Sequence, residues 1–340
     1  MPPSTTPSSL PRRMPLWVAF VPLLIGGLGY GWLWSGYAER LRADVGRVLP
    51  GRTVTISGFP YRVAASVDTA KVAVDRPGLT ASLTAAAATV DRGPWHPELS
   101  VVRLSGVEFR LAVPPLRGVM TAIDAPAALV SVHVEDGKLQ RLSTVFDHPR
   151  FSFGLFPGAL TATRLETHVR ELLPALTGPS APTPPVQAQL VVAGTGVQLA
   201  GGDPLRLDAD VAVTGNQPLR SVAGWAAGGT AEVRRLTLAD ASGEVLALVA
   251  TAVPGAAGRL QLAGTIDTIC PASVAVLFNG GAVSEQRLRR PVRLSFAGPA
   301  GTLRLAAPDT VGLARRTQLP PCPVLRRSTL ASIAALRVGA

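Results

Sequence analysis

Lysine is nearly absent from this chain of 340 residues. Of its 33 basic residues only Lys71 and Lys138 are lysines, so the other 31 are arginines, against 22 acidic residues. The net charge of +11 thus reflects an arginine bias of the kind that GC-rich codons produce, and it does not by itself indicate a binding function. Aromatic residues make up only 5% of the chain, which leaves little material for the stacking platforms of single-strand nucleic-acid binders. We expect no nucleic-acid partner.

The residue patterns of catalytic and metal centres are missing as well. No histidine has a second His or a Cys at metal-ligand spacing; the four are His96, His133, His148 and His168. No G-x-S-x-G elbow occurs, neither lysine stands in a phosphate-binding loop, and Gly194-Thr195-Gly196 lacks the third glycine of a dinucleotide-binding turn. We therefore expect no metal, no cofactor and no catalytic residue, and we interpret the chain as a protein that is not an enzyme.

Cysteine occurs only twice, at Cys270 and Cys322. In an exported domain such a pair is a candidate disulfide, which would close a loop of about fifty residues and contribute up to roughly 4 kcal/mol in the chain-entropy model. The alternative is two buried thiols that never meet. Cys322 lies in Pro-Pro-Cys-Pro, a run that favours extended backbone over helix.

Charge is missing from one long stretch near the N-terminus. The 25 residues from 14 to 38 carry none, and as a helix they would span about 37 Å, enough to cross a hydrocarbon core of about 30 Å. Trp17 at one end, and Trp32, Trp34 and Tyr37 at the other, match the aromatic belts of two membrane interfaces. Tyr37 is also too bulky for a signal-peptidase site, so the stretch predicts an uncleaved signal anchor.

This anchor implies a location for the rest of the chain. We expect residues 1–13 to be a cytoplasmic tail and residues 14–38 to be a single transmembrane helix in the inner membrane. Long domains that follow such an anchor are exported with little regard to charge. The chain after about residue 45 is therefore predicted to be periplasmic.

Beyond the anchor the dominant hydrophobic period is two. Leu205, Leu207, Ala209, Val211 and Val213 alternate with mostly polar residues, as in a strand with one solvent-exposed face. Residues 107–113 and 130–134 alternate in the same way, the second run ending at the turn signal 136–137. The apolar face switches parity near 69–71 and again across 234–235, which predicts a bulge or break at both places. We therefore expect a mainly β fold, a long curved antiparallel meander.

Helical patterns are few. Residues 218–229 and 271–281 keep helical spacing and end in glycines, and residues 165–172 could form a third helix, although period two fits part of that segment too. The proline-rich segment 174–186 predicts a loop or linker. It divides the exported part into a first β-rich half, 45–173, and a second, 187–325, followed by a C-terminal tail, 326–340.

A tight corner, Gly58-Phe59-Pro60-Tyr61, follows the anchor and precedes the first long alternating run. Gly58 supplies backbone freedom and Pro60 fixes φ, so that the chain can turn off the bilayer and start a sheet. Phe59 and Tyr61 can then pack on the core or at the lipid interface. We interpret this corner as structural.

The chain resembles a family of envelope proteins of Gram-negative bacteria known as domain of unknown function 2125. The resemblance rests on the order of short motifs: Ile56–Arg62 after a membrane helix, Trp225–Gly229 leading into a strand at 232–238, then Val292–Phe296, Leu303–Leu305 and Pro320-Pro321. It implies a structural role for Gly58, Phe59, Pro60, Trp225, Gly228 and Gly229. The family is similar in style to the AsmA-like envelope proteins, in which a signal anchor precedes long β-rich periplasmic domains linked to lipid homeostasis.

Basic charge is concentrated near the C-terminus. Nine arginines and one acid lie between residues 287 and 327, a net charge of +8. This excess indicates a contact with anionic headgroups or an acidic partner, made by Arg287, Arg289, Arg290 and Arg293. The alternative is a solvated strand face, because arginines here alternate with apolar residues.

Two functions fit these patterns. In the first, an anchored periplasmic protein binds lipid or another hydrophobic ligand in an apolar groove of its curved sheet, in envelope homeostasis. In the second, the sheet is covered by its own elements, and the protein is a structural or protein-interaction scaffold that uses its basic C-terminal face. The state of the inner sheet face, open and apolar or packed shut, distinguishes the two.

Overall fold

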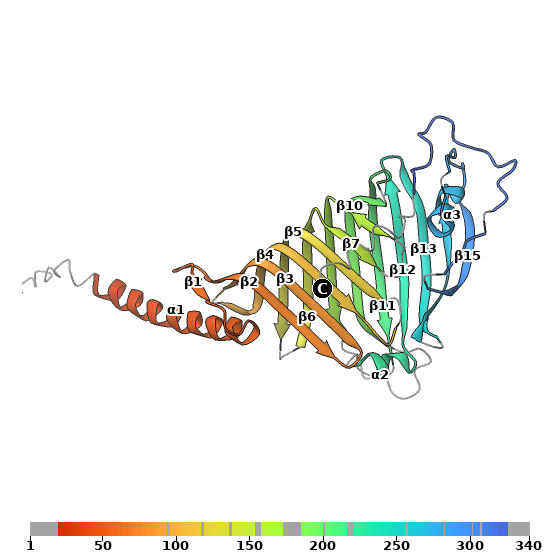
Figure 1. Cartoon of the computed structure of the whole chain (residues 1–340). Helices are drawn as coiled ribbons and strands as arrows, with labels where there is room; N and C mark the ends of the chain where they lie inside the picture. Colours follow the sequence, from red (N-terminus) through yellow and green to blue (C-terminus); the bar gives the residue numbers. More distant parts are fainter. Residues whose placement is uncertain are drawn as a thin grey trace, which may run out of the picture.

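The computed structural model of the chain describes residues 20–93, 95–116, 119–135, 138–153, 158–172, 185–199, 201–215, 221–255, 258–281, 283–300, 302–306 and 308–325. The prediction of a mainly β fold is confirmed (Figure 1). The helices are α1 (Phe20–Val48), α2 (Val222–Ala226) and α3 (Pro271–Asn279). The strands are β1 (Thr55–Ser57), β2 (Val63–Arg76), β3 (Leu79–Gly93), β4 (His96–Ala112), β5 (Met120–Glu135), β6 (Lys138–Asp147), β7 (Arg150–Phe153), β8 (Ala159–Thr161), β9 (Arg164–Glu171), β10 (Val186–Leu199), β11 (Leu205–Thr214), β12 (Thr230–Asp240), β13 (Gly243–Pro254), β14 (Leu260–Thr268) and β15 (Val292–Pro299).

The strands form one antiparallel sheet that follows the sequence. From β1 to β5 and from β10 to β15 each strand pairs with the next, as expected for a meander. Between these two runs, β6 and β7 pair with successive parts of β5, and β9 and β8 pair with successive parts of β10. Each of these two pairs therefore acts as one interrupted strand.

The third predicted helix, over 165–172, is wrong. Every residue from Ala188 to Thr195 of β10 pairs with β9, so the period-two pattern of this segment prevails over the helical one. This pairing also joins the two predicted halves of the chain into a single sheet. Most of the predicted proline-rich linker, namely residues 174–184, and the predicted turn at 136–137 lie outside the described residues.

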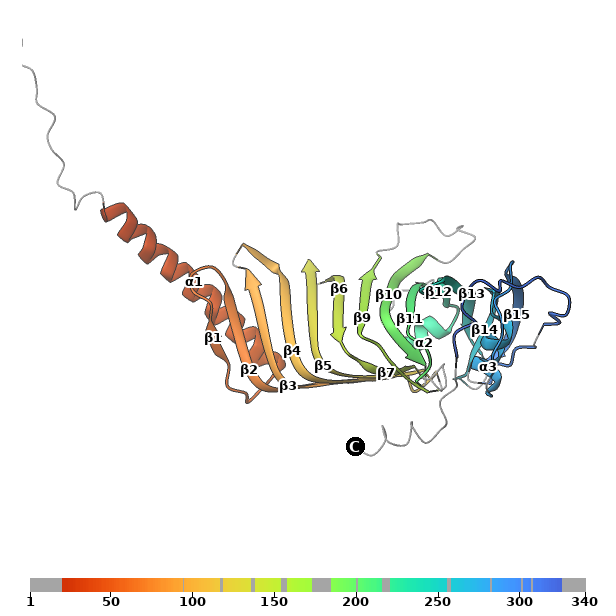
Figure 2. The same ribbon diagram turned by 90° about the horizontal axis from the view of Figure 1, so that it is seen from above.

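A sharp bend crosses neighbouring strands of the sheet at a common level, and Figure 2 shows β2 to β5 turning together there. In three of the bent strands it coincides with a residue at positive φ: Thr69 (61°), Gly106 (56°) and Gly196 (62°), and His148 (43°) lies between β6 and β7. We call this row the bend line. The predicted parity switch near 69–71 is its first member, and pairing there is interrupted for one residue with no change of register, so it is a break and not a bulge.

At the bend line each strand turns two successive residues outward. Buried residues consequently stand three apart across it, as the pairs 67 and 70, 85 and 88, 104 and 107, and 125 and 128 show. The inside of the bend carries the main core, where Ala65, Ala85 and Leu165 are fully buried. Small residues at this corner let the two segments of each strand, before and after the bend, approach each other closely.

Helix α1 is longer than the predicted anchor and belongs partly to the domain. Its second half packs into the main core through Ala38, Leu41 and Val45, and Asp44 forms an ion pair with Arg92 of β3 at 2.8 Å. The predicted end of the helix at residue 38 is therefore wrong. The polar residues after 38 occupy the solvent side of an amphipathic helix, which continues to Val48.

The first half of α1 extends away from the strands (Figure 2). Leu23, Leu24, Ile25 and Leu28 are each more than 60% exposed. Within the described residues, neither α1 nor any other helix is both long enough and apolar enough to span a membrane. Residues 14–19, the start of the predicted span, lie outside the described residues.

The corner at residues 58–61, which we call the glycine corner, attaches α1 to the sheet. The Tyr30 hydroxyl donates a hydrogen bond to the Pro60 carbonyl, and Trp34 Nε1 donates to the Arg62 carbonyl at 3.1 Å. The Phe59 ring packs edge-on against Trp34 with ring centres 5.4 Å apart. Gly58 has a φ of 100°, and a Cβ there would lie 2.7 Å from the Arg62 carbonyl oxygen, so only glycine fits.

If the second half of α1 is part of the folded domain, truncating its core side chain will destabilise the whole protein. We expect Leu41→Ala to lower the free energy of unfolding by about 2–5 kcal/mol, because Leu41 is buried in the core. Leu28→Ala, at an exposed position on the same helix, will change it very little. Denaturant unfolding of the full chain in detergent, followed by near-UV circular dichroism, measures both. Equal effects would contradict the assignment.

The bend line predicts a difference in stability between two glycine-to-alanine variants. Gly196 and Gly201 both have positive φ, but a Cβ at Gly196 would collide with Thr163 whereas one at Gly201 would meet open space. Gly201→Ala is expected to cost about 1–2 kcal/mol of backbone strain. Gly196→Ala is expected to cost about 1–3 kcal/mol more, from overpacking. The same unfolding measurement tests this, and similar losses would show that the close approach at Gly196 is unimportant.

Candidate functional site

An apolar cavity of about 780 Å³ lies where the last strands curl toward the bent part of the sheet. Strand β13 shows how the sequence builds its wall. Leu246, Leu248, Ala250 and Ala252 point into the cavity, while Val249 between them is 53% exposed on the other face. Alternation of side chains along a strand thus gives one cavity face and one outer face.

The predicted parity switch at 234–235 keeps β12 in the same wall. Pairing with β11 and β13 shifts by one residue here, which confirms a bulge. As a result Val233 and Leu236, three residues apart, both line the cavity, while Arg234 and Arg235 both face outward. The bulge therefore continues the apolar wall where strict alternation would have turned an arginine inward.

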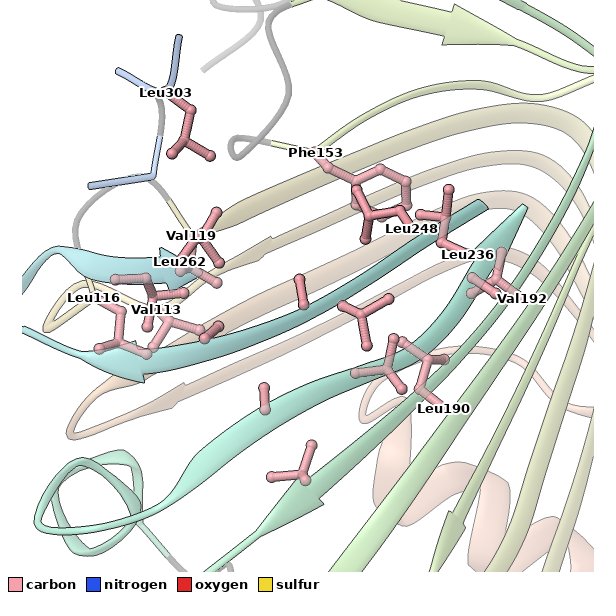
Figure 3. A pocket seen from close by; sticks show the side chains of 18 of the residues that line it. Val113, Leu116, Val119, Phe153, Leu190, Val192, Leu236, Leu248, Leu262 and Leu303 are labelled. Atoms are coloured by element: carbon pink, nitrogen blue, oxygen red, sulfur yellow. The ribbon is translucent and has the colours of Figure 1, made fainter. Parts of the chain in front are cut away.

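The remaining walls come from distant parts of the chain. The β7 and β8 strands contribute Phe151, Phe153 and Leu160, and α3 contributes Leu277. Figure 3 shows Phe153 beside Leu236 and Leu248 of the opposite wall. Helix α3 begins at Pro271, directly after Cys270, which a disulfide joins to Cys322. This crosslink holds the C-terminal segment beside the helix that forms the wall.

Three loops form the rim at one end of the cavity. They are the β2–β3 hairpin tip (76–79), the β4–β5 loop (113–119, of which 117 and 118 are not described) and the start of α2 (221–225). A Cβ on Gly78 would lie 3.3 Å from Val222 and 3.5 Å from Pro115, so the three loops meet at this point. The bend line makes this contact possible, because it directs the hairpin tip toward α2.

The cavity offers almost no polar chemistry. Among the described residues that line it, only Arg76 and Ser221 have polar side chains, apart from the indole of Trp225. Ser221 Oγ accepts a hydrogen bond from Gly224 N at 3.0 Å, and Trp225 Nε1 donates to the Thr214 carbonyl at 3.1 Å. Arg76 is exposed at the rim. The walls can therefore exclude water and hold hydrocarbon, and the described residues that line them include no carboxylate, histidine, lysine or cysteine.

The motif residues of the second half fasten α2 beneath the cavity. Trp225 lines the cavity and a Cβ at Gly229 would collide with its indole ring, so glycine is required there. Gly228 has a φ of 154°. These three residues therefore act together in the structure, whereas Gly58, Phe59 and Pro60 lie far from the cavity, at α1.

The expected aromatic belt is divided. Trp32 is 80% exposed on α1, but Trp34 and Tyr37 are partly buried against the main core, so two of the three expected interface residues on this part of the helix contact protein. Their spacing places them on the side of the helix that faces the sheet, together with Leu41. Trp17 lies outside the described residues.

The predicted anionic contact is wrong for Arg287, which is 1% exposed. Its guanidinium pairs with Asp240, and its Nε donates to the Pro320 carbonyl at 2.9 Å. Burial of the long side chain is possible here because Asp240 neutralises it and the C-terminal segment supplies carbonyl acceptors. Arg287 therefore clamps residues 320–321 to the β12–β13 turn.

The other arginines of this group are exposed. Arg289 and Arg290 lie on the surface before β15. Arg293 forms two hydrogen bonds of 2.8 Å with Asp267 of β14. These hydrogen bonds lower the pKa of the Asp267 carboxyl and raise the pKa of Arg293. The alternation of Arg293 with Val292 and Leu294 matches the solvated strand face that was the alternative.

No group of three or more His, Cys, Asp or Glu side chains in the described ranges is arranged to hold a metal. His168 contacts Ser143 at 2.9 Å and Glu166 at 3.7 Å, and His96 and His148 each contact one carboxylate, of Glu98 and Asp147. Sequence reasoning identified the apolar alternation of the cavity strands but not the rim loops. The only signal for these loops is the clustering of apolar residues in turns, at 77–79 and 113–119.

A buried cation with one neutralising partner predicts a large loss when it is removed. We expect Arg287→Gln to lower the free energy of unfolding by about 3–5 kcal/mol, because Asp240, only 15% exposed, is left without its partner. Arg289→Gln, at the exposed position two residues later, is expected to stay within about 0.5 kcal/mol. Thermal and denaturant unfolding of the two variants measures the difference. A destabilised Arg289 variant beside an unchanged Arg287 variant would refute the clamp.

Comparison with known proteins gives one match. No curated protein and no solved structure matches the chain. A family model described as an uncharacterized protein conserved in bacteria, DUF2125, matches residues 36–313, from the middle of α1 to beyond β15. This range contains the glycine corner, the bend line and the cavity, and the resemblance stated from the sequence is confirmed. The chain belongs to the DUF2125 family of uncharacterised bacterial proteins.

Proposed function

We propose that this protein holds the hydrocarbon chain of a lipid, or of a similar amphiphile, in the cavity formed by β10 to β14, and that it acts from the periplasmic side of the inner membrane. The observation that carries this proposal is the cavity itself, about 780 Å³ with walls that are apolar throughout β11, β12 and β13. Its volume lies within the range of sites that enclose small organic ligands.

The chemistry of the walls selects the class of ligand. Burial of each methylene group contributes about 0.8 kcal/mol, so a long chain gains affinity with every carbon that it places inside. A charged or polar group inside would lose its hydration, because Ser221 and Trp225 carry the only polar side-chain atoms among the described residues inside the rim, and Trp225 Nε1 already donates to the Thr214 carbonyl. The ligand therefore keeps its polar head outside, on the side of the rim where Arg76 is exposed.

Three features support a membrane location. The uncharged stretch 14–38 has the length and flanks of a signal anchor. The first half of α1 is apolar and exposed, clear of the sheet. The disulfide between Cys270 and Cys322 suits an oxidising compartment outside the cytoplasm.

The scaffold function has less support than it had from the sequence. It relied on a free basic face near the C-terminus, but Arg287 is buried and paired, and Arg293 is neutralised by Asp267. An open apolar cavity also favours an occupant, because its lining lacks packing contacts that a hydrocarbon chain would supply. For an enzymatic role, the described residues of the cavity walls offer no carboxylate, histidine or cysteine.

The test is to fill the cavity and to measure bound lipid. Val211→Trp places an indole among the lining residues of β11, whereas Val249→Trp makes the same change on the outer face of β13. We expect native mass spectrometry of the detergent-extracted protein to show co-purified lipid on the wild type and on Val249→Trp. Val211→Trp is expected to lose it and to bind a fluorescent fatty-acid probe at least about tenfold more weakly, a difference of about 1.4 kcal/mol.

Circular dichroism of both variants establishes that they are folded. Equal binding by the two tryptophan variants, or no bound lipid on any of the three proteins together with no binding of the probe, would overturn the proposal.

A further inference from the structure

Exposed aromatic rings gather at one end of the described chain. Trp32 is 80% exposed, Phe59 58%, Tyr61 88% and Trp95 68%. Apart from these, Phe20 near the start of α1 is the one large aromatic side chain exposed in the described residues. Single exposed apolar residues are common on soluble domains, but here four rings of a chain with only 5% aromatic residues are exposed.

The four rings lie at one level of the fold. Val63 pairs with Arg92, so the corner that carries Tyr61 lies beside the β3–β4 turn that carries Trp95. Helix α1 is fastened to the same corner by Tyr30 and Trp34. Trp32, between these two residues on the helix, is therefore at the height of the corner. We call Trp32, Phe59, Tyr61 and Trp95 the aromatic edge.

The side chains on the exposed surface of α1 change from apolar to charged at this edge. On one side, Leu23, Leu24 and Leu28 are exposed and apolar, and residues 20–38 carry no charge. On the other side the helix carries Glu39, Arg40 and Arg42 and packs into the protein core. Aromatic side chains with one apolar body and one polar group are typical of the level at which a membrane protein passes from hydrocarbon to water.

We propose that the aromatic edge is a membrane-docking surface of the folded domain, in which the corner at 58–61 and the β3–β4 turn lie in the headgroup layer of a lipid bilayer. The occupant is a bilayer because the edge is continuous with the exposed apolar half of α1. The inference rests on the proposed membrane location and goes beyond it, since it assigns Tyr61 and Trp95, which are not part of the anchor, to the lipid surface. Contact at the edge and insertion of α1 together hold the sheet at one orientation.

Labels at matched positions test the proposal. Tyr61→Cys and Trp95→Cys place a thiol on the aromatic edge, and Val311→Cys places one at the far end of the domain, where Val311 is 90% exposed against 88% for Tyr61. Each full-length variant is labelled with an environment-sensitive fluorophore and incorporated into nanodiscs of phosphatidylcholine and phosphatidylglycerol. The same discs are also prepared with lipid that carries a spin label just below the headgroup.

We expect the labels at 61 and 95 to show blue-shifted emission in nanodiscs and to lose intensity with spin-labelled lipid, while the label at 311 does neither. Quenching would establish lipid as the neighbour, because a second copy or another protein would shift the emission without quenching it. A chain that incorporates into nanodiscs while its labels at 61 and 95 behave like the label at 311 overturns the docking surface alone. A chain that does not co-migrate with nanodiscs overturns the membrane location and the docking surface together.

Discussion

The requirement that hydrogen-bonded strands bend together determines most of this structure. A strand cannot turn a corner while its neighbour runs straight, because the ladder between them would break. At the bend line each strand from β2 to β10 therefore turns at the residue that faces the turn of its neighbour, with the register kept on both sides. The main core fills the inside of the corner, and the hairpin tip at Gly78 reaches α2 on the far side.

The sequence predicted the strands well because their outer faces are polar. Alternation over 205–213 and the parity switch across 234–235 correspond to β11 and to the bulge of β12. The bend line was visible only at Thr69, because elsewhere its signal is a pair of buried apolar residues three positions apart, such as Ala85 and Ala88 or Leu104 and Val107, in a chain rich in apolar residues. A collective bend becomes recognisable only when several strands are aligned side by side.

Two errors of the sequence analysis share a physical cause. The charge at Glu39 was taken as the end of α1, and the arginine excess near 287 as an exposed surface. In both places a charged residue belongs to a packed part of the protein. The helix presents Glu39 to solvent and Leu41 to the core, and Arg287 is buried because it pairs with Asp240. Local composition describes which residues are present, but burial depends on partners that are distant in the sequence, 47 residues apart for this ion pair. The rim of the cavity could not be predicted from the sequence for the same reason, because it is built from three loops that are distant in the chain.

The bend line also restricts how the length of this chain can change during evolution. Between the bend and the tip of the β2–β3 hairpin, the residues from Ala70 to Arg76 pair one to one with those from Leu79 to Ala85. A single residue added to one arm would turn every later side chain of that arm to the opposite face and move its corner out of line with the neighbouring strand. Such hairpins can therefore lengthen or shorten only by matched additions or deletions in both arms. Relatives of this protein should differ in the reach of their hairpins by even numbers of residues, while the corner stays in place.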